Sequence, residues 1–580
     1  MQPNSMRDSS QADLWLLFIT GILYTMALGS PRAWTEHEIH LVATAKSMVE
    51  TGDWIVPRLG DYPWVEKPPL PQWSIALSAL VWGGFTEWSS RFPSACVGCL
   101  VIWLTYRLHR QLFGPEIGWW SALLQATTVY QFSYARLAES DIYLQACYLG
   151  ALWIWCRGEV RTQRTGITPT TWEIWIFWAL FGLMNLSKGL LFGNILITVT
   201  LTGWYLLHRD VWGFFQRWFR LGPIVCAMLI AMSWPLAVAH EDSTAIELWL
   251  THTVGRMRGT AGYQQPAWYY FTTIWWQLLP WTCFLIPWFR PQIWRMTATQ
   301  HPYLRWCLWW GLSQVILLSF SRGKHHHYLI HALPAFSPLL AYGMQGMLQN
   351  LDHVLMNPRL QRYLQISRVS VSVVFPAILL VGVLMLHRQL TLSWVDIMVA
   401  VALGVSGHIL LWRCSPSLLI PFKYDNPSAK QTWRPIAVGL FGFICLLECG
   451  VVTLIIPRRD PSRADREFLQ ALATVVRPEQ PVIVTGQQEL ARHVCYLQRP
   501  VLAVWDPEIA VQIAQQHQRA CLVARRRQIE PSINEEDAVE RLLESRYTRR
   551  ERSPSDRYAA YEFRQRDSRA GAVTADMVHR

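Results

Sequence analysis

Charged residues are scarce in this sequence. Only 16% of its 580 residues are Asp, Glu, Lys or Arg, whereas ordinary soluble domains contain about 25%. Hydrophobic residues make up 52% of the chain, which also contains 33 tryptophans. Apolar runs about 20 residues long, the length needed to cross a bilayer as a helix, recur from Ala12 to about Pro457. This composition excludes an ordinary soluble domain and predicts an α-helical polytopic membrane protein.

Several other signals are missing. No small-residue cleavage site follows the first apolar run, DLWLLFITGILYTMALG, so we interpret this run as a retained span and not as a signal peptide. The 12 cysteines show no disulfide spacing, and most lie in apolar runs, where they act as small core residues. Cys495 and Cys521 lie in the polar tail, and we leave open whether they pair there in an oxidising compartment.

Basic loops set the topology. Residues 73–88 are apolar but short, and we predict an interfacial or re-entrant helix there. With the N-terminus in the cytoplasm, about thirteen spans then make all of the inside loops basic, as the positive-inside rule favours. Counting 73–88 as a span would instead move the basic loop RLHR outside. The predicted spans are residues 13–30, 91–107, 117–135, 141–156, 172–187, 189–207, 221–239, 267–288, 303–320, 328–347, 369–386, 394–412 and 435–456.

The chain divides into three predicted parts. Residues 1–457 form a transmembrane domain with an outer catalytic loop at 31–90, and the odd number of spans places the tail outside the membrane. In residues 458–565, short apolar runs such as PVIVTG alternate with helical stretches, which predicts a small α/β domain. This domain has no glycine-rich phosphate loop. Residues 566–580 are polar, and we expect them to be disordered.

The first outer loop begins with a cluster of polar residues. Glu36, His37 and Glu38 directly precede residues 39–49, whose apolar spacing predicts an amphipathic helix on the membrane surface. Carboxylates at the mouth of a membrane cavity are candidate general bases or metal ligands. The alternative is a solvated helix start, where Glu36 simply interacts with the helix dipole. The sequence leaves both open.

Asp141 and Lys188 interrupt apolar surroundings. Asp141 lies where a helix enters the bilayer from outside, either as a helix cap or as a functional ionisable group. Lys188 lies on the outer side, against the positive-inside trend, so we expect an anionic partner. Several cations around an outer cavity suit a phosphate or pyrophosphate. Four more cations break the trend in the same way: Arg256, Arg258, Arg322 and Lys324.

Two further segments carry polar residues. The adjacent histidines 325–327 point in different directions, which disfavours a shared metal ion, and the following Tyr328 is either a phosphate donor or an interfacial anchor. In GDYPWVEKPPLPQW the prolines hold the backbone extended. Glu66 and Lys67 are therefore expected on a rigid outer loop at the water boundary.

Six motifs occur in order over roughly residues 12–350: GDWIVPRLGDYPWVEKPPLPQW, RFPSACVGCLVIWLTYRLHRQLFG, ARLAESDIYL, LSKG, PAWYYF with LLPW, and KHHHYLIHALPAFSPLLA. Together they resemble the family 39 glycosyltransferases of the GT-C type, which include bacterial lipid A aminoarabinose transferases and protein O-mannosyltransferases. The aminoarabinose-transferase-like branch is the most similar, and it also has about thirteen spans and a small outer C-terminal domain.

The resemblance implies a glycosyltransferase of the inner membrane with a polyprenyl-phosphate-linked sugar donor. The acceptor would be a lipid, a glycan or a protein at the outer face, and direct displacement would invert the anomeric carbon. No nucleic acid is expected as a partner. The sugar and the acceptor cannot be read from the loops.

Family roles fall on particular residues. The resemblance places catalytic carboxylates among Glu36, Glu38 and Asp141, donor-phosphate contacts at Lys67, Lys188, Lys324 and Tyr328, and orienting roles at Glu66 and His37. Two positions depart from the family pattern: His37 stands where an Asp is usual, and Tyr263 where a histidine is usual. We therefore assign no cofactor and leave a divalent metal at Glu66 open.

Two rival functions remain. Transporters and lipid flippases often show inverted repeats and ionisable groups near mid-membrane. This sequence has no repeat, and its distinctive residues gather on one predicted face, which favours an interfacial enzyme. A catalytically inactive, lipid-binding member of the family also stays open because of the departures at His37 and Tyr263.

Overall fold

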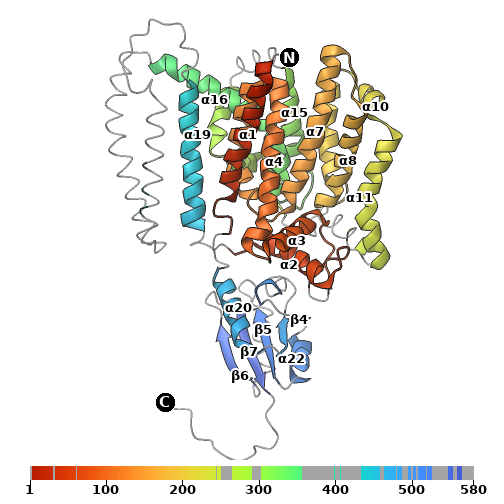
Figure 1. Cartoon of the computed structure of the whole chain (residues 1–580), viewed down its shortest axis with the longest axis vertical. Coiled ribbons are helices and arrows are strands. Elements are labelled where there is room, and N and C mark those ends of the chain that lie inside the picture. Colours follow the sequence, from red (N-terminus) through yellow and green to blue (C-terminus); the bar gives the residue numbers. More distant parts are fainter. Residues whose placement is uncertain are drawn as a thin grey trace, which may run out of the picture. The chain divides into compact units, whose positions relative to one another are not determined.

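The structure is a computed structural model of the 580-residue chain (Figure 1). It describes residues 3–29, 33–59, 62–242, 245–247, 249, 264–289, 302–355, 398, 401, 405, 433–456, 463–477, 480–485, 494–497, 501–504, 507–516, 519–525, 547–552 and 558–564. The predicted span 369–386 and the predicted disordered tail 566–580 lie outside the described residues, as does almost all of the predicted span 394–412.

The chain forms two compact units. One contains residues 1–30 and 66–459, and the other contains residues 31–65 and 460–580. The sequence grouped residues 31–65 with the transmembrane domain, whereas their contacts place them with the C-terminal unit.

The first unit is almost entirely helical. Its described elements are α1 (Pro3–Thr25), α3 (Leu70–Trp82), α4 (Glu87–Phe113), α5 (Pro115–Ala126), α6 (Val129–Tyr134), α7 (Ser140–Thr165), α8 (Thr171–Lys188), α9 (Phe192–Leu207), α10 (Gly213–Trp218), α11 (Leu221–Glu241), α13 (Tyr269–Gln277), η1 (Trp281–Phe289), α15 (Pro302–Ser319), η2 (His326–Ala332), α16 (Leu333–Leu355), α19 (Trp433–Gly450) and η5 (Val451–Ile455).

Local sequence explains where these helices begin and end. A capping box formed by Thr86 and Ser89 starts α4. Gly114, at φ 88°, ends α4, and Pro115 opens α5 directly after it. The two helices pack closely at Gly118, which has no side chain. A Cβ at this position would lie only 2.6 Å from the backbone nitrogen of Arg110. Only glycine fits at this crossing.

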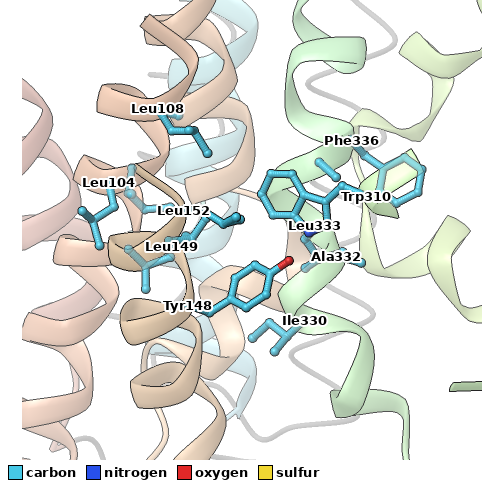
Figure 2. Close-up of a cluster of buried hydrophobic side chains, with 14 of the residues drawn as sticks. Leu104, Leu108, Tyr148, Leu149, Leu152, Trp310, Ile330, Ala332, Leu333 and Phe336 are labelled. Atoms are coloured by element: carbon cyan, nitrogen blue, oxygen red, sulfur yellow. The ribbon is translucent and has the colours of Figure 1, made fainter. Parts of the chain in front are cut away.

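The core of the unit lies between long helices that run side by side. α7 packs against both α4 and α8, α1 packs against α4, and α8 packs against α11 (Figure 1). Large aromatic side chains fill the interior; Trp155, Trp204 and Trp306 are almost completely buried and contact one another. Figure 2 shows one part of this core, where Tyr148 and Leu152 of α7 face Trp310 of α15 and Leu333 of α16.

Two predicted spans are interrupted. The run 117–135 divides into α5 and α6 at Thr127 and Thr128, and the run 267–288 divides into α13 and η1 near Pro280. The two interruptions meet: the Val129 amide donates to the Leu279 carbonyl at 2.8 Å, and Trp281 Nε1 donates to Thr127 Oγ1 at 3.0 Å. Backbone groups that leave a helix in an apolar environment need such partners.

Two described segments, Leu221–Glu241 and Arg434–Thr453, are long and apolar enough to cross a membrane by length and composition. The longer helices α4 and α7, with 27 and 26 residues, carry charged residues toward their ends. The predicted number of thirteen spans stays a prediction. The short helix predicted at residues 73–88 is present as α3, which has 13 residues and packs on α4, α7 and α8. It begins earlier, at Leu70, and ends at Trp82, before Gly83 in the left-handed region.

The second unit combines a sheet with helices. Its described elements are α2 (Glu36–Thr51), β1 (Arg58–Leu59), β2 (Tyr62–Pro63), α20 (Arg463–Val475), β3 (Val482–Thr485), β4 (Val501–Val504), α22 (Pro507–Gln516), β5 (Arg519–Arg525), β6 (Tyr547–Arg552) and β7 (Tyr558–Arg564). A five-stranded sheet has the order β4-β3-β5-β7-β6. β3 is parallel to β4 and β5, while β7 is antiparallel to β5 and β6. An α/β arrangement is therefore present in this unit.

Residues 31–65 attach to the C-terminal segment through specific contacts. The Trp34 ring stacks on Tyr496, with centroids 5.0 Å apart and an angle of 25° between the rings. The Trp34 amide donates to Tyr496 Oη at 3.0 Å, and Lys46 Nζ donates to the Val494 carbonyl at 2.9 Å. Cys495 and Cys521 are both buried in this unit.

Candidate functional site

A buried ion pair lies at the centre of the candidate site. Asp141 is in the first turn of α7, Lys188 is the last residue of α8, and the two side chains form a salt bridge. Their side chains are 2% and 13% exposed, respectively. The N-cap of α7 is Glu139, so Asp141 is not the cap residue of its helix. Burying two charges has a large desolvation cost, which further polar contacts must offset. Ionisable groups buried in this way in a membrane protein are usually functional.

Aromatic rings and a histidine enclose this pair. Lys188 Nζ lies 4.5 Å from the centre of the Tyr328 ring and 5.4 Å from that of Phe192, both within cation–π range. His331 Nε2 lies 3.9 Å from Asp141 Oδ1. The structure thus brings together three residues that the sequence singled out separately, Asp141, Lys188 and Tyr328. It adds Phe192 and His331, which the sequence analysis did not select.

Hydrogen bonds fix the segment that carries Tyr328 and His331. The His325 carbonyl accepts from Tyr270 Oη at 3.1 Å, and the His326 carbonyl accepts from Gln277 Nε2 at 2.8 Å. Tyr130 Oη bonds the ring of His326, and Gln145 Nε2 donates to the Ile330 carbonyl at 2.9 Å. Bonds to the histidine run therefore anchor η2 onto α6 and α13, and the bond to Ile330 anchors it onto α7. Among the described residues, no group of three or more His, Cys, Asp or Glu side chains could hold a metal ion.

Lys324 is buried before η2. Its amine donates to the carbonyls of Ser321 and, at 3.1 Å, Gln265. Burial lowers the pKa of this lysine. Its observed contacts are to loop carbonyls, although an ammonium group has three donors and two bonds leave one available.

Lys67 interacts electrostatically with Lys188 of the ion pair. Glu66 and Lys67 are half-buried at the turn that leads into α3. The positive charge of Lys67 repels that of Lys188, whereas Glu139 attracts it. Lys67 thus acts on the same region as Asp141 and Lys188.

The polar cluster of the first loop forms the start of α2, in the second unit. Glu38 Oε2 accepts from the Thr35 amide at 2.9 Å, and Thr35 Oγ1 accepts from the Glu38 amide at 3.3 Å. This capping box accounts for one oxygen of the buried Glu38 side chain, while His37 is exposed. Glu36 is the first residue of the helix. The helix predicted for residues 39–49 is thus present.

Arg136 of the ARL motif has a role that the sequence did not assign. Its buried guanidinium donates to the carbonyls of Leu23 and Tyr24 at 3.0 and 2.9 Å, at the end of α1. It also lies 5.2 Å from the centre of the Phe132 ring. The described contacts make Arg136 a cap for α1. Three residues noted in the sequence, Arg256, Arg258 and Tyr263, lie outside the described residues.

The chain is similar to known sugar transferases. The family model of dolichyl-phosphate-mannose-protein mannosyltransferases matches residues 66–236, a stretch that contains Glu66, Lys67, Asp141 and Lys188. An undecaprenyl phosphate-α-4-amino-4-deoxy-L-arabinose arabinosyl transferase of Shewanella sediminis is 27% identical over 353 residues, which cover 58% of this chain and 60% of that protein. The protein of the same name from Yersinia pestis is 25% identical over 346 residues, 58% of this chain and 59% of the relative.

A solved structure extends the likeness over nearly the whole chain. The crystal structure of ArnT from Cupriavidus metallidurans bound to undecaprenyl phosphate matches with a TM-score of 0.69 and 17% identity, covering 95% of this chain and 97% of ArnT. This likeness shows a shared fold. The protein therefore has an α-helical membrane fold of the GT-C type. Among proteins with this fold, the chain resembles the aminoarabinose transferases.

Proposed function

We propose that the protein is an integral-membrane glycosyltransferase that transfers a sugar from a polyprenyl-phosphate-linked donor to a lipid, glycan or protein acceptor. The observation that carries this proposal is the buried pair of Asp141 and Lys188 beside Tyr328. These residues come from α7, α8 and η2, three segments that are distant in sequence. The named relatives act on undecaprenyl phosphate-linked aminoarabinose, and the family model covers both members of the pair.

The cations suit a lipid phosphate as the leaving group. Lys188 has one described carboxylate partner and lies over an aromatic ring, and the charge of Lys67 reaches the same region. In an enclosed site, fixed cations stabilise the charge that develops on the departing phosphate. Lys324 and Tyr328 would add contacts to the same phosphate. The apolar helices would hold the isoprenoid chain.

The carboxylates suit the acceptor. A hydroxyl nucleophile needs a base, and Glu36, Glu38 and Asp141 are the candidates. Of these, Asp141 is beside the proposed phosphate site. One direct displacement would invert the anomeric carbon without a covalent enzyme intermediate. Glu66 and His37 would orient neighbouring charged groups.

The membrane setting follows from the fold, and the sidedness is part of the proposal. The basic loops favour a cytoplasmic N-terminus, which places Asp141, Lys188 and the C-terminal unit at the outer face of the inner membrane. On α3, Leu77, Leu80, Val81 and Trp82 are more than half exposed, with exposures of 57%, 55%, 80% and 53%. Such an apolar end suits a helix lying in the membrane interface.

A transfer assay on the purified full-length chain tests the proposal. Undecaprenyl phosphate-linked sugars, beginning with 4-amino-4-deoxy-L-arabinose, are supplied with lipid A as acceptor, and released undecaprenyl phosphate is measured. If the acceptor is wrong, donor hydrolysis gives a second readout for the same site. We expect Lys188→Met and Asp141→Asn each to lower the rate by about 100-fold or more, as loss of one preorganised charge does in other enzymes.

Asp13→Asn is the matched control. Asp13 also forms an ion pair, with Arg107 Nη1 at 3.0 Å, but this pair joins α1 to α4 and includes no residue of the candidate site. We expect its rate to stay within about twofold of the wild type, because partly exposed ion pairs contribute little. Undiminished turnover in the Lys188 and Asp141 variants would refute the site assignment.

A further inference from the structure

His331 is a buried polar side chain that the proposed chemistry has not used. It is 0% exposed, and neither ring nitrogen has a hydrogen-bond partner among the described residues. Buried polar groups in proteins are nearly always hydrogen-bonded, so an imidazole in this state calls for an explanation. Its Nε2 lies 3.9 Å from Asp141 Oδ1, which is about 1 Å longer than a typical N–H···O hydrogen bond.

The position of this ring is well defined. Gln145 lies one turn after Asp141 on α7 and donates to the carbonyl of Ile330, the residue before His331. The imidazole packs between the rings of Tyr148 and Phe192, with centroids 6.2 and 6.1 Å away. Ile330 and Ala332 are the residues on either side of His331 in the chain, and Figure 2 shows them close to Tyr148. Only a small movement would bring the ring to the carboxylate.

The ion pair cannot persist unchanged through the proposed reaction. Lys188 is bonded to Asp141 in this structure, and a donor phosphate would compete for the same ammonium group. As the Lys188 ammonium moves toward the phosphate, the negative charge of Asp141 loses its partner. The Asp141 side chain is only 2% exposed, so water cannot replace that partner. An uncompensated buried carboxylate is strongly unfavourable, so Asp141 then needs another donor.

We propose that His331 is a positioning residue, whose Nε2–H binds the Asp141 carboxylate when Lys188 turns to the donor phosphate. This inference rests on the proposed function. A neutral imidazole suffices, because one of its two nitrogens always carries a proton. The neighbouring Lys188 ammonium disfavours a second positive charge at the same place. The exchange keeps Asp141 ionised and in place while it faces the acceptor.

Binding of undecaprenyl phosphate to the full-length protein in detergent tests this exchange. His331→Leu keeps an apolar volume but has no donor, whereas His331→Gln retains an N–H near the Nε2 position. We expect the Leu variant to bind about tenfold more weakly, because a hydrogen bond to a charged group is lost. The Gln variant should stay within about threefold of the wild type. Undecaprenol, which has no phosphate, should bind all three proteins equally.

A double variant sharpens the test. In an Asp141→Asn background there is no carboxylate to hold, so His331→Leu should then have no further effect on undecaprenyl phosphate binding. Equal losses in the Leu and Gln variants, or a loss that undecaprenol shares, would make the imidazole a packing residue and overturn the inference.

The two levels of failure are distinguishable. If the wild type does not bind undecaprenyl phosphate, the proposed function falls and this inference falls with it. If the wild type binds and His331→Leu binds equally well, only the inference is overturned, because the phosphate site is then intact without the imidazole.

Discussion

At the scale of single residues, the salt bridge between Asp141 and Lys188 makes a quantitative prediction. Removing one member of a buried pair leaves the other charge uncompensated, at a cost of about 3 kcal/mol or more. We expect Asp141→Asn and Lys188→Met each to lower the free energy of unfolding by about this amount. Denaturation in mixed detergent micelles measures it.

The double variant is the control for this pair. With both charges gone no ion remains unpaired, so Asp141→Asn with Lys188→Met should cost clearly less than the sum of the two single changes. Additive losses would mean that the two residues contribute independently, and that the salt bridge is not what stabilises the site.

The sequence could predict part of this site. Asp141 and Lys188 stood out because a charge in an apolar run is rare, and Tyr328 because it follows a polar loop. The salt bridge between them could not be predicted from a single sequence, since the two residues are 47 positions apart in the chain. His331 gave a weak signal, one histidine in the apolar run LIHALPAF, which is also what a satisfied core histidine would show.

At the scale of helices, hydropathy located apolar segments but not their interruptions. Residues 117–135 look like one span because threonine is only mildly polar. Thr127 Oγ1 instead donates to the Leu123 carbonyl at 3.0 Å, and Thr128 Oγ1 accepts from the Gln131 amide at 3.3 Å. Such side-chain bonds compete with the helix and allow it to end. The partner that completes the break, the Leu279 carbonyl, is distant in sequence.

Arg136 caps the end of α1. Arg136 supplies donors to the last carbonyls of this helix, which have no partner within it. We expect Arg136→Met to lower the free energy of unfolding by about 2–3 kcal/mol, because two charge-assisted hydrogen bonds are lost in a buried place. Arg136→Lys should recover part of this, since a lysine cannot reproduce the fork of donors.

Arg434→Met is the comparison for Arg136. Arg434 Nε pairs with Glu116 Oε1 at 2.7 Å, but the two side chains are 45% and 37% exposed. We expect a loss below about 1 kcal/mol from this change. Similar losses at Arg136 and Arg434, measured by the same detergent denaturation, would contradict a capping role for Arg136.

At the scale of the whole molecule, sequence reasoning found the α/β character of the C-terminal part but not all of its extent. The apolar strands β3, β4 and β5 were predicted because they are buried runs. The strands β6 and β7, with sequences YTRRER and YAAYEFR, were missed because their charges resemble a loop. β6 is an edge strand, where charge is common. The sequence analysis assigned residues 31–65 to the transmembrane domain because they follow α1 directly in the chain. Their contacts group them with the C-terminal segment instead.

Tyr496 is the residue through which this last assignment can be tested. It is 3% exposed, stacks on Trp34 and accepts the Trp34 amide through its hydroxyl. We expect Tyr496→Ala to speed amide hydrogen exchange in α2 by about 100-fold, corresponding to the roughly 3 kcal/mol typical of a buried aromatic side chain. Tyr496→Phe removes only the hydroxyl, and its effect should be about tenfold or less.

Hydrogen exchange read by mass spectrometry separates local from global loosening. If Tyr496 joins residues 31–65 to the C-terminal segment, exchange in α2 rises more than exchange in the interior strand β3. Thr474→Ala, at an exposed position of α20, should change neither, because the Thr474 hydroxyl donates to the carbonyl of Ala471 in the same helix. Unchanged exchange in α2 of the Tyr496→Ala protein would mean that residues 31–65 are held by other contacts. The C-terminal segment would then not stabilise the start of α2, where Glu36, His37 and Glu38 lie.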